Sequence, residues 1–189
     1  MLSNLGNILL FGSIFITISI IYFSYQNIKE KNILIGKNIV YLSFFQITFI
    51  IASFLLLIFA FVFSDFSLLA VYQNSHTAKP IFYKVAGVWG NHEGSLLLWV
   101  NIMVIFSFLF FLINYKFNKN YCLYTLLVQN ILILGFLVFL ISNSNPFFKI
   151  LPIPSEGLGL NPILQDPALA IHPPLLYLGF VGSSIYFSA

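Results

Sequence analysis

Four uncharged apolar runs, each long enough to cross a lipid bilayer, constrain this chain most strongly. A membrane-spanning helix takes about 20 consecutive apolar residues. The runs cover residues 5–25, 39–63, 95–114 and 121–142, and a fifth begins near Ile171 and is still apolar at Ala189. The runs lack the segments of about 10 residues with alternating polarity that mark a membrane barrel. Because only helices or closed barrels satisfy the backbone in lipid, we expect an all-α, polytopic membrane protein with four complete spans and the start of a fifth, residues 171–189.

The composition supports this class and excludes others. Only 7% of the residues are charged and 60% are hydrophobic, whereas about a quarter of the residues in a soluble domain are charged. The net charge of +3 arises from lysines alone, without arginine. A nucleic-acid-binding protein would gather such charges into a patch, so we expect the lipid bilayer and no nucleic acid as a partner. The single Cys122 cannot form an internal disulfide, and any thiol chemistry must come from another protein.

The lysines also predict an orientation. The short loops 26–38 and 115–120 are more basic than the long loops 64–94 and 143–170. The lysines of the short loops are Lys29, Lys31, Lys37, Lys116 and Lys119, and those of the long loops are Lys79, Lys84 and Lys149. The positive-inside rule places the short loops in the cytoplasm or matrix. The N-terminus and the long loops then face outward, as do every histidine and four of the five acids: His76, His92, His172, Asp65, Glu93, Glu156 and Asp166. We expect the working surface on this outer face.

The first chemical motif runs from Trp89 through Gly90, Asn91, His92, Glu93 and Gly94 to Ser95, directly before the third span. One interpretation is structural: Ser95 caps the helix, and Trp89 anchors at the membrane interface. The other is a polar site in which Glu93 orients or charges His92. The sequence leaves both interpretations open.

The second motif joins a proline-rich outer loop to the fifth span. Seven of the eight prolines lie between Pro146 and Pro174, and an unstructured loop of this length would be unusual, so we expect an ordered cover. His172 precedes two prolines, which suit the first turn of a helix. The positive end of a helix dipole there would favour a neutral imidazole, the form that binds metal. Alternatively, the ring of His172 hydrogen-bonds loop carbonyls.

The remaining polar residues predict less. We expect His76 to be a solvated loop residue, and three histidines without shared spacing do not make a zinc site. We assign no catalytic residue, because no nucleophile triad or phosphate-binding loop is present in the sequence. Five polar residues within the spans, Gln46, Thr48, Asn101, Gln129 and Asn130, are expected to bond between helices. The spans hold no Lys, Asp or Glu, which argues against a proton-coupled transporter.

Together, these motifs closely resemble the CcmF family. The similarity includes Trp89 to Trp99, Asn145-Pro146-Phe147, Gly159 to Pro162, Gln165-Asp166-Pro167 and Ile171 to Gly182. CcmF is the haem lyase subunit of system I cytochrome c maturation, and its nitrite-reductase-associated paralogue NrfE shares the pattern. The resemblance covers essentially all 189 residues and implies the N-terminal membrane part of a larger protein. The fifth span lacks a polar flank, which favours a truncated or split product.

The resemblance also implies a site. His172 matches the family's outer-face histidine that ligates the iron of the substrate haem b, and its partner histidine lies beyond Ala189. Trp89, His92 and Glu93 are expected as supporting or docking residues. The family's tryptophan-rich outer segment and the histidines for its resident haem are absent from the 189 residues, so we expect the fragment alone to be inactive.

The family's activity sets the functional expectation. A CcmE-type haem chaperone delivers haem, which is joined by thioether bonds to the CxxCH apocytochrome c that a CcmH-type partner presents. We expect a multi-pass protein of the bacterial inner membrane with a periplasmic N-terminus, or alternatively of the mitochondrial inner membrane. The functional alternatives are an NrfE-type lyase subunit dedicated to nitrite reductase and a non-catalytic scaffold or transporter subunit.

Overall fold

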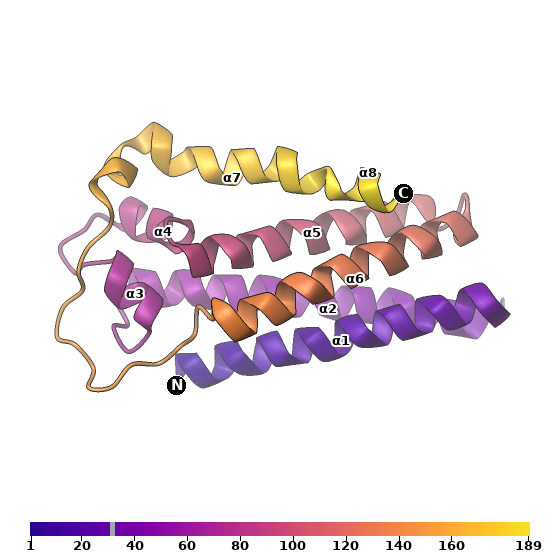
Figure 1. Cartoon of the computed structure of the whole chain (residues 1–189), viewed down its shortest axis with the longest axis horizontal. Helices are drawn as coiled ribbons and strands as arrows, with labels where there is room; N and C mark the ends of the chain where they lie inside the picture. Colours follow the sequence, from indigo (N-terminus) through magenta and orange to yellow (C-terminus); the bar gives the residue numbers. More distant parts are fainter. Residues whose placement is uncertain (31–32) are drawn as a thin grey trace.

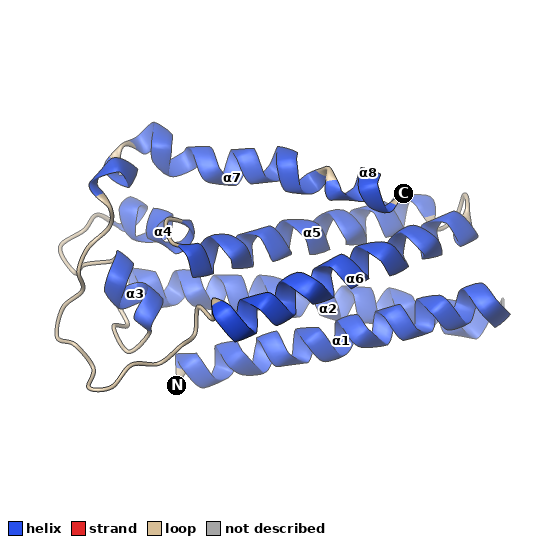
Figure 2. Ribbon diagram, viewed as in Figure 1, coloured by secondary structure: helices blue, strands red, loops and turns tan. Residues whose placement is uncertain are grey.

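Long helices lie side by side in an elongated bundle (Figure 1). The computed structural model describes residues 1–30 and 33–189, and the side chains outside residues 30–37. The long helices are α1 (Leu2–Glu30), α2 (Ile33–Val62), α5 (His92–Asn114), α6 (Lys119–Asn143) and α7 (Pro167–Gly182), which continues past a bend into α8 (Ser184–Ser188). The described residues contain helices and loops but no strand (Figure 2). The all-α, multi-pass fold is therefore confirmed.

Four of the five candidate spans are longer than the sequence predicts. The candidate membrane-spanning segments are Leu2–Lys29, Asn38–Val62, His92–Asn114, Lys119–Asn143 and Pro167–Ser188. The expected fifth span is present: the last segment has 22 residues, a length that can cross a bilayer, and it begins at Pro167 and not near Ile171. Residues 167–170 are helical and lie before Ile171, near which we expected the span to begin.

The long loops also contain helices. Residues 64–94 fold into α3 (Leu69–Asn74) and α4 (Ile81–Trp89), and the proline-rich loop includes the 3₁₀ turn η1 (Pro162–Gln165). These short elements gather at the end of the bundle where the N-terminus lies (Figure 1). The first long loop is therefore a pair of short helices, which brings α4 against α5 and α7.

Small side chains let α1 and α2 pack closely. The buried residues of α1 recur at alternating intervals of three and four, and many are small: Ser3, Gly6, Leu10, Ser13, Thr17, Ile20, Ser24 and Asn27. On α2 the same interval gives Ile39, Ser43, Gln46, Ile50, Ser53, Leu57 and Ala60. Small residues at this spacing are typical of helix contacts in membranes, where close backbone approach replaces the hydrophobic driving force.

Three of the five polar residues in the spans bond between helices, as predicted. Gln46 Nε2 donates to Thr17 Oγ1 and Asn130 Oδ1, each at 2.8 Å, which joins α1, α2 and α6. Gln129 bonds to Ser184 and Ser188 of α8 at 2.9 and 2.6 Å. The prediction is wrong for the other two: Asn101 donates to Leu97 O and Thr48 donates to Phe44 O, one turn back on their own helices.

The bundle has two chemically different ends. The helices alternate in direction, so all three histidines and the acids Asp65, Glu93, Glu156 and Asp166 lie at the end that holds α3, α4 and η1 (Figure 1). Lys29, Lys116 and Lys119 lie at the opposite end. Lys31 and the Lys37 side chain, which also support the predicted orientation, lie outside the described part of the chain. The predicted histidines and acids therefore gather at one end of the bundle, and the outward orientation of that end stays a prediction.

Backbone hydrogen bonds join the two long loops at this end. Leu69 N donates to Phe148 O at 2.9 Å, and Leu158 N donates to Tyr72 O at 2.8 Å. Gly157 lies so close to the first loop that a Cβ atom there would be 2.1 Å from Ser75 O. Since the shortest side chain would clash, glycine is required at this crossing. The proline-rich loop is thus a cover bound to α3 and its flanking residues.

Candidate functional site

Asn91, and not Ser95, starts α5. Asn91 Oδ1 accepts a hydrogen bond from Gly94 N at 2.7 Å, and Ser95 Oγ donates to Asn91 O at 2.6 Å. The expected Ser95 cap is wrong because Asn91, an equally good cap residue, begins the helix four residues earlier. A Cβ atom at Gly94 would lie 1.6 Å from Val88 O. Gly94 therefore lets the end of α4 rest directly on the first turn of α5.

His92 and Glu93 are consequently the first two residues of α5. His92 Nδ1 lies 2.9 Å from Ser144 Oγ, just after α6, and the ring meets Phe139 edge-on at 6.3 Å. Neighbouring residues on a helix point in different directions, and no hydrogen bond links Glu93 to His92 among the described residues. The structure gives the orienting role expected of Glu93 to Ser144, which the sequence did not single out. Glu93 remains a half-buried acid in the first turn.

The start of α7 also differs from the prediction. Asp166 accepts hydrogen bonds from Ala168 N and Leu169 N at 2.9 and 3.0 Å, and Pro167 is the first helical residue. The expectation that Pro173 and Pro174 open the helix is therefore wrong: both lie inside it. An aspartate cap followed by proline is a stronger start. His172 stands in the second turn, so the helix-end argument for its neutral form does not apply.

The two prolines leave one carbonyl without a helical partner. An α-helical carbonyl accepts from the N–H four residues on, and a tighter turn uses the N–H three residues on. Proline occupies both positions after Ala170, namely 173 and 174, and proline has no N–H. Trp89 Nε1, at the end of α4, donates to Ala170 O at 2.8 Å. This bond connects the two sequence motifs directly.

His172 faces away from this contact. It lies two positions after Ala170, a rotation of about 200° around the helix. The inner side of α7 is buried or half-buried at Ala170, Pro173, Pro174 and Tyr177, whereas His172 is exposed. Among the described residues no group hydrogen-bonds the His172 ring, so the alternative in which it bonds loop carbonyls is not what the structure shows.

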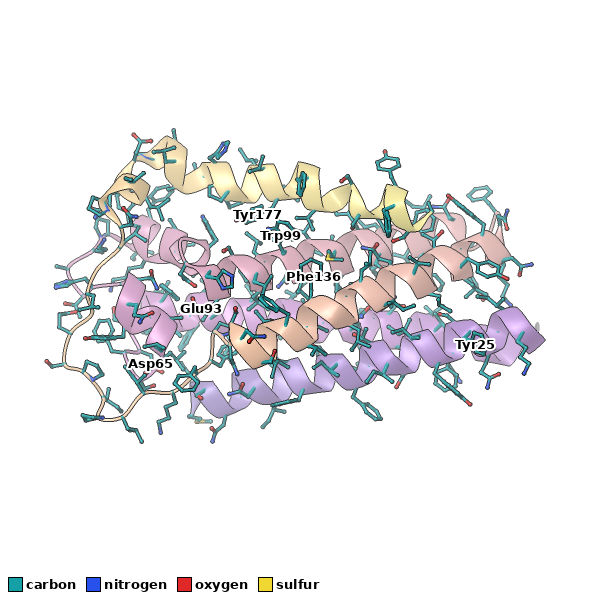
Figure 3. All side chains as sticks on the ribbon, viewed as in Figure 1. Tyr25, Asp65, Glu93, Trp99, Phe136 and Tyr177 are labelled. Carbon is teal, nitrogen blue, oxygen red and sulfur yellow. The ribbon has the colours of Figure 1, made fainter. Side chains whose placement is uncertain are left out.

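A narrow aromatic groove lies beneath His92, between α5, α6 and α7. It encloses about 290 Å³ and is lined by His92, Ser95, Leu96, Trp99, Phe136 and Tyr177. Trp99 from α5, Phe136 from α6 and Tyr177 from α7 converge there (Figure 3), with the Trp99 ring 5.8 Å from Phe136 and 5.6 Å from Tyr177. No sequence pattern indicates this groove, because aromatic residues recur throughout the spans.

Glu156 joins the cover to the loop that holds His76. Its carboxylate accepts hydrogen bonds from the Thr77 side chain and from the backbone N–H of Thr77 and Gly157. Because these bonds favour the ionised form, chiefly the Thr77 hydroxyl, the pKa of Glu156 falls to about 2. His76 Nδ1 lies 3.9 Å from Glu156 Oε1 but accepts from Ala78 N at 3.1 Å. That nitrogen has no proton to give, so this contact is proximity and not a hydrogen bond.

The described residues can supply one imidazole to a metal but not a complete site. No three His, Cys, Asp or Glu residues gather in a metal-binding cluster within the described chain. His172 is exposed on α7, whose beginning is held by the Asp166 cap and by the Trp89 bond to Ala170 O, and its imidazole would be a suitable ligand for haem iron.

The fold defines a multi-pass helical membrane protein whose histidines lie at one end of the bundle. Residues 89–189 match the family described as Cytochrome C assembly protein. The chain belongs to that family. The match begins at Trp89 and includes Ala170 and His172.

Curated relatives agree. The chain is similar to the cytochrome c-type biogenesis proteins CycK of Rhizobium meliloti (52% identical, 72% of this chain and 20% of the relative), CcmF of Escherichia coli (45%, 72% and 21%) and NrfE of Haemophilus influenzae (41%, 70% and 21%). A solved structure described as Cytochrome c Heme Lyase CcmF has the same fold, with a TM-score of 0.83 at 23% identity over 100% of this chain and 29% of that one. The predicted resemblance to the CcmF/NrfE family is confirmed. The chain spans about a fifth of the length of these three curated relatives.

Proposed function

We propose that this chain is the part of a cytochrome c haem lyase that presents one axial ligand, His172, to haem. The observation that carries the proposal is the exposed imidazole on α7, a helix held by the Asp166 cap and by the Trp89 bond to Ala170 O. His172 and its neighbour Ile171 are exposed, which leaves room for a second ligand on the far side of the iron. Cytochrome c biogenesis is what the family and the curated relatives support.

The proposal extends to the substrates and partners. Haem b is delivered as substrate by a CcmE-type chaperone and joined to the CxxCH thiols of an apocytochrome c held by a CcmH-type protein. Each cysteine S–H adds across a haem vinyl group, so that an S–C bond forms and the thiol proton ends on the other vinyl carbon. The chain's own contribution is ligation and orientation, in agreement with its lack of a cysteine pair. We place the site on the periplasmic face of a bacterial inner membrane, with the N-terminus on that face.

The test is the substitution His172→Ala in the complete protein, with His76→Ala as the matched control. Both residues lie at the polar end of the bundle, but His76 accepts a bond from its own loop. We expect His172→Ala to abolish most holocytochrome c and the haem that copurifies with the chaperone complex, and His76→Ala to leave both near wild type. Normal cytochrome c and an unchanged haem spectrum in His172→Ala would overturn the proposal.

A further inference from the structure

Among the described residues, Trp89 is the side chain that compensates for the break in the hydrogen bonding of α7. Within the first two turns of the helix, Ala170 O is the carbonyl with proline at both positions that could donate to it. An unpaired backbone carbonyl is costly near lipid, where water cannot replace the lost donor. The Trp89 indole is half-buried and reaches this atom at 2.8 Å. It is therefore a required partner more than a membrane-interface anchor.

The Trp89 bond fixes the direction of α7 at the residue where the helix is weakest. Two consecutive prolines remove two helical bonds and favour a kink. A fixed contact at Ala170 O restricts the rotation of α7 relative to α4. His172 is only two residues away on the same helix, so its ring direction depends on this contact.

The position of Trp89 is itself well determined. It is the last residue of α4, whose end rests on α5 through the close approach of Val88 O to Gly94. Gly90, the next residue, lies so close to η1 and the residues before it that a Cβ atom there would be 2.9 Å from a methyl group of Leu164. The indole donor is therefore anchored by α5 on one side and by the cover on the other.

We propose that Trp89 is a positioning residue for His172, acting through its indole N–H bond to the Ala170 carbonyl that Pro173 and Pro174 leave without a helical donor. The inference rests on the proposed function for its effect on haem, and on the structure alone for its effect on α7. In this proposal Trp89 acts through α7, by its bond to Ala170 O, and not by a contact of its own with haem.

A single-atom change tests the bond without altering the packing. Site-specific replacement of Trp89 by benzothienylalanine exchanges the indole N–H for sulfur in the complete protein. The matched control is the same replacement at Trp99, whose indole N–H has no acceptor among the described residues and whose ring packs on Phe136 and Tyr177. We expect about a tenfold loss of His172-ligated haem at position 89, the scale of one unsatisfied buried acceptor. An equal change at both positions would overturn the inference.

Pro174→Ala provides an independent check, because residue 174 then has an N–H that can donate to Ala170 O. In that background the benzothienylalanine change at position 89 should cost less than about twofold. A tenfold loss persisting there would show that Trp89 acts by packing and would contradict the proposal. Hydrogen exchange of residues 169–178 gives a readout without haem: it should rise for the position-89 replacement and not for position 99. If exchange responds while His172→Ala leaves haem unchanged, the positioning inference holds and the proposed function fails.

Discussion

The contact between Gly94 and the end of α4 permits the sharpest stability prediction. A Cβ atom at position 94 would lie 1.6 Å from Val88 O, and an ordinary contact needs at least 3.4 Å, so the two backbones would have to separate by about 2 Å. No rotamer change can relieve this, because both partners are backbone or Cβ atoms. Overpacking of this kind costs about 1–3 kcal/mol, and distortion of the Asn91 cap adds about 1 kcal/mol. We expect Gly94→Ala to lower the free energy of unfolding by about 2–4 kcal/mol.

The assay is equilibrium unfolding in detergent, with helix content as the signal. Gly135→Ala is the matched control, since Gly135 lies in α6 and a Cβ atom there would meet nothing within 4 Å. Alanine is the better helix former by up to about 1 kcal/mol, so the control should be neutral or slightly stabilising. A Gly94→Ala protein within about 0.5 kcal/mol of wild type would refute the close approach of α4 and α5.

Two further predictions concern the cover and the bundle. The folded pKa of Glu156, about 2, lies below its ordinary 4.5, so its stabilising bonds to Thr77 are intact above pH 4.5 and are lost as the pH falls toward 2. The protection of the Thr77 amide against hydrogen exchange, measured relative to its intrinsic rate at each pH, should fall over this range. A Glu156→Gln protein whose protection keeps the same pH dependence would contradict the assignment. Gln46→Leu removes the bonds to Thr17 and Asn130 and should destabilise the bundle by about 0.6–1.7 kcal/mol, measured by unfolding in detergent. The control Thr48→Val, at an exposed residue bonded within its own helix, should leave the free energy of unfolding unchanged. Equal effects of the two substitutions would argue against the three-helix contact.

The sequence predicts the parts of this structure that depend on hydrophobic length. Runs of uncharged apolar residues identify the long helices, because the bilayer forces each run to satisfy its own backbone. The first and last residues of these helices are harder to predict from the sequence, because they depend on competition between alternative cap residues. Asn91 and Ser95 are both good caps, and only the close packing of Gly94 on Val88 selects the earlier one.

The candidate site is likewise predictable from the sequence only in part. His172 stands out from the sequence by its motif, but its surroundings depend on contacts between distant segments. The Pro173–Pro174 pair suggested a helix start, whereas Asp166 and Pro167 provide a better one six residues earlier. The sequence does imply that Ala170 O needs a donor from outside α7. It cannot identify Trp89 as that donor, since 81 residues separate them and the pairing depends on where α4 packs.

The role of His172 as a haem ligand is tested most directly by chemical rescue. In the complete protein, His172→Gly leaves a space that free imidazole can enter, and holocytochrome c is measured with and without imidazole in the medium. Ligation by His172 predicts that the variant makes little holocytochrome c and that added imidazole restores it, together with the bis-histidine spectrum of the haem held with the chaperone. Full activity without imidazole would contradict the ligand assignment, and so would a loss that imidazole leaves unchanged.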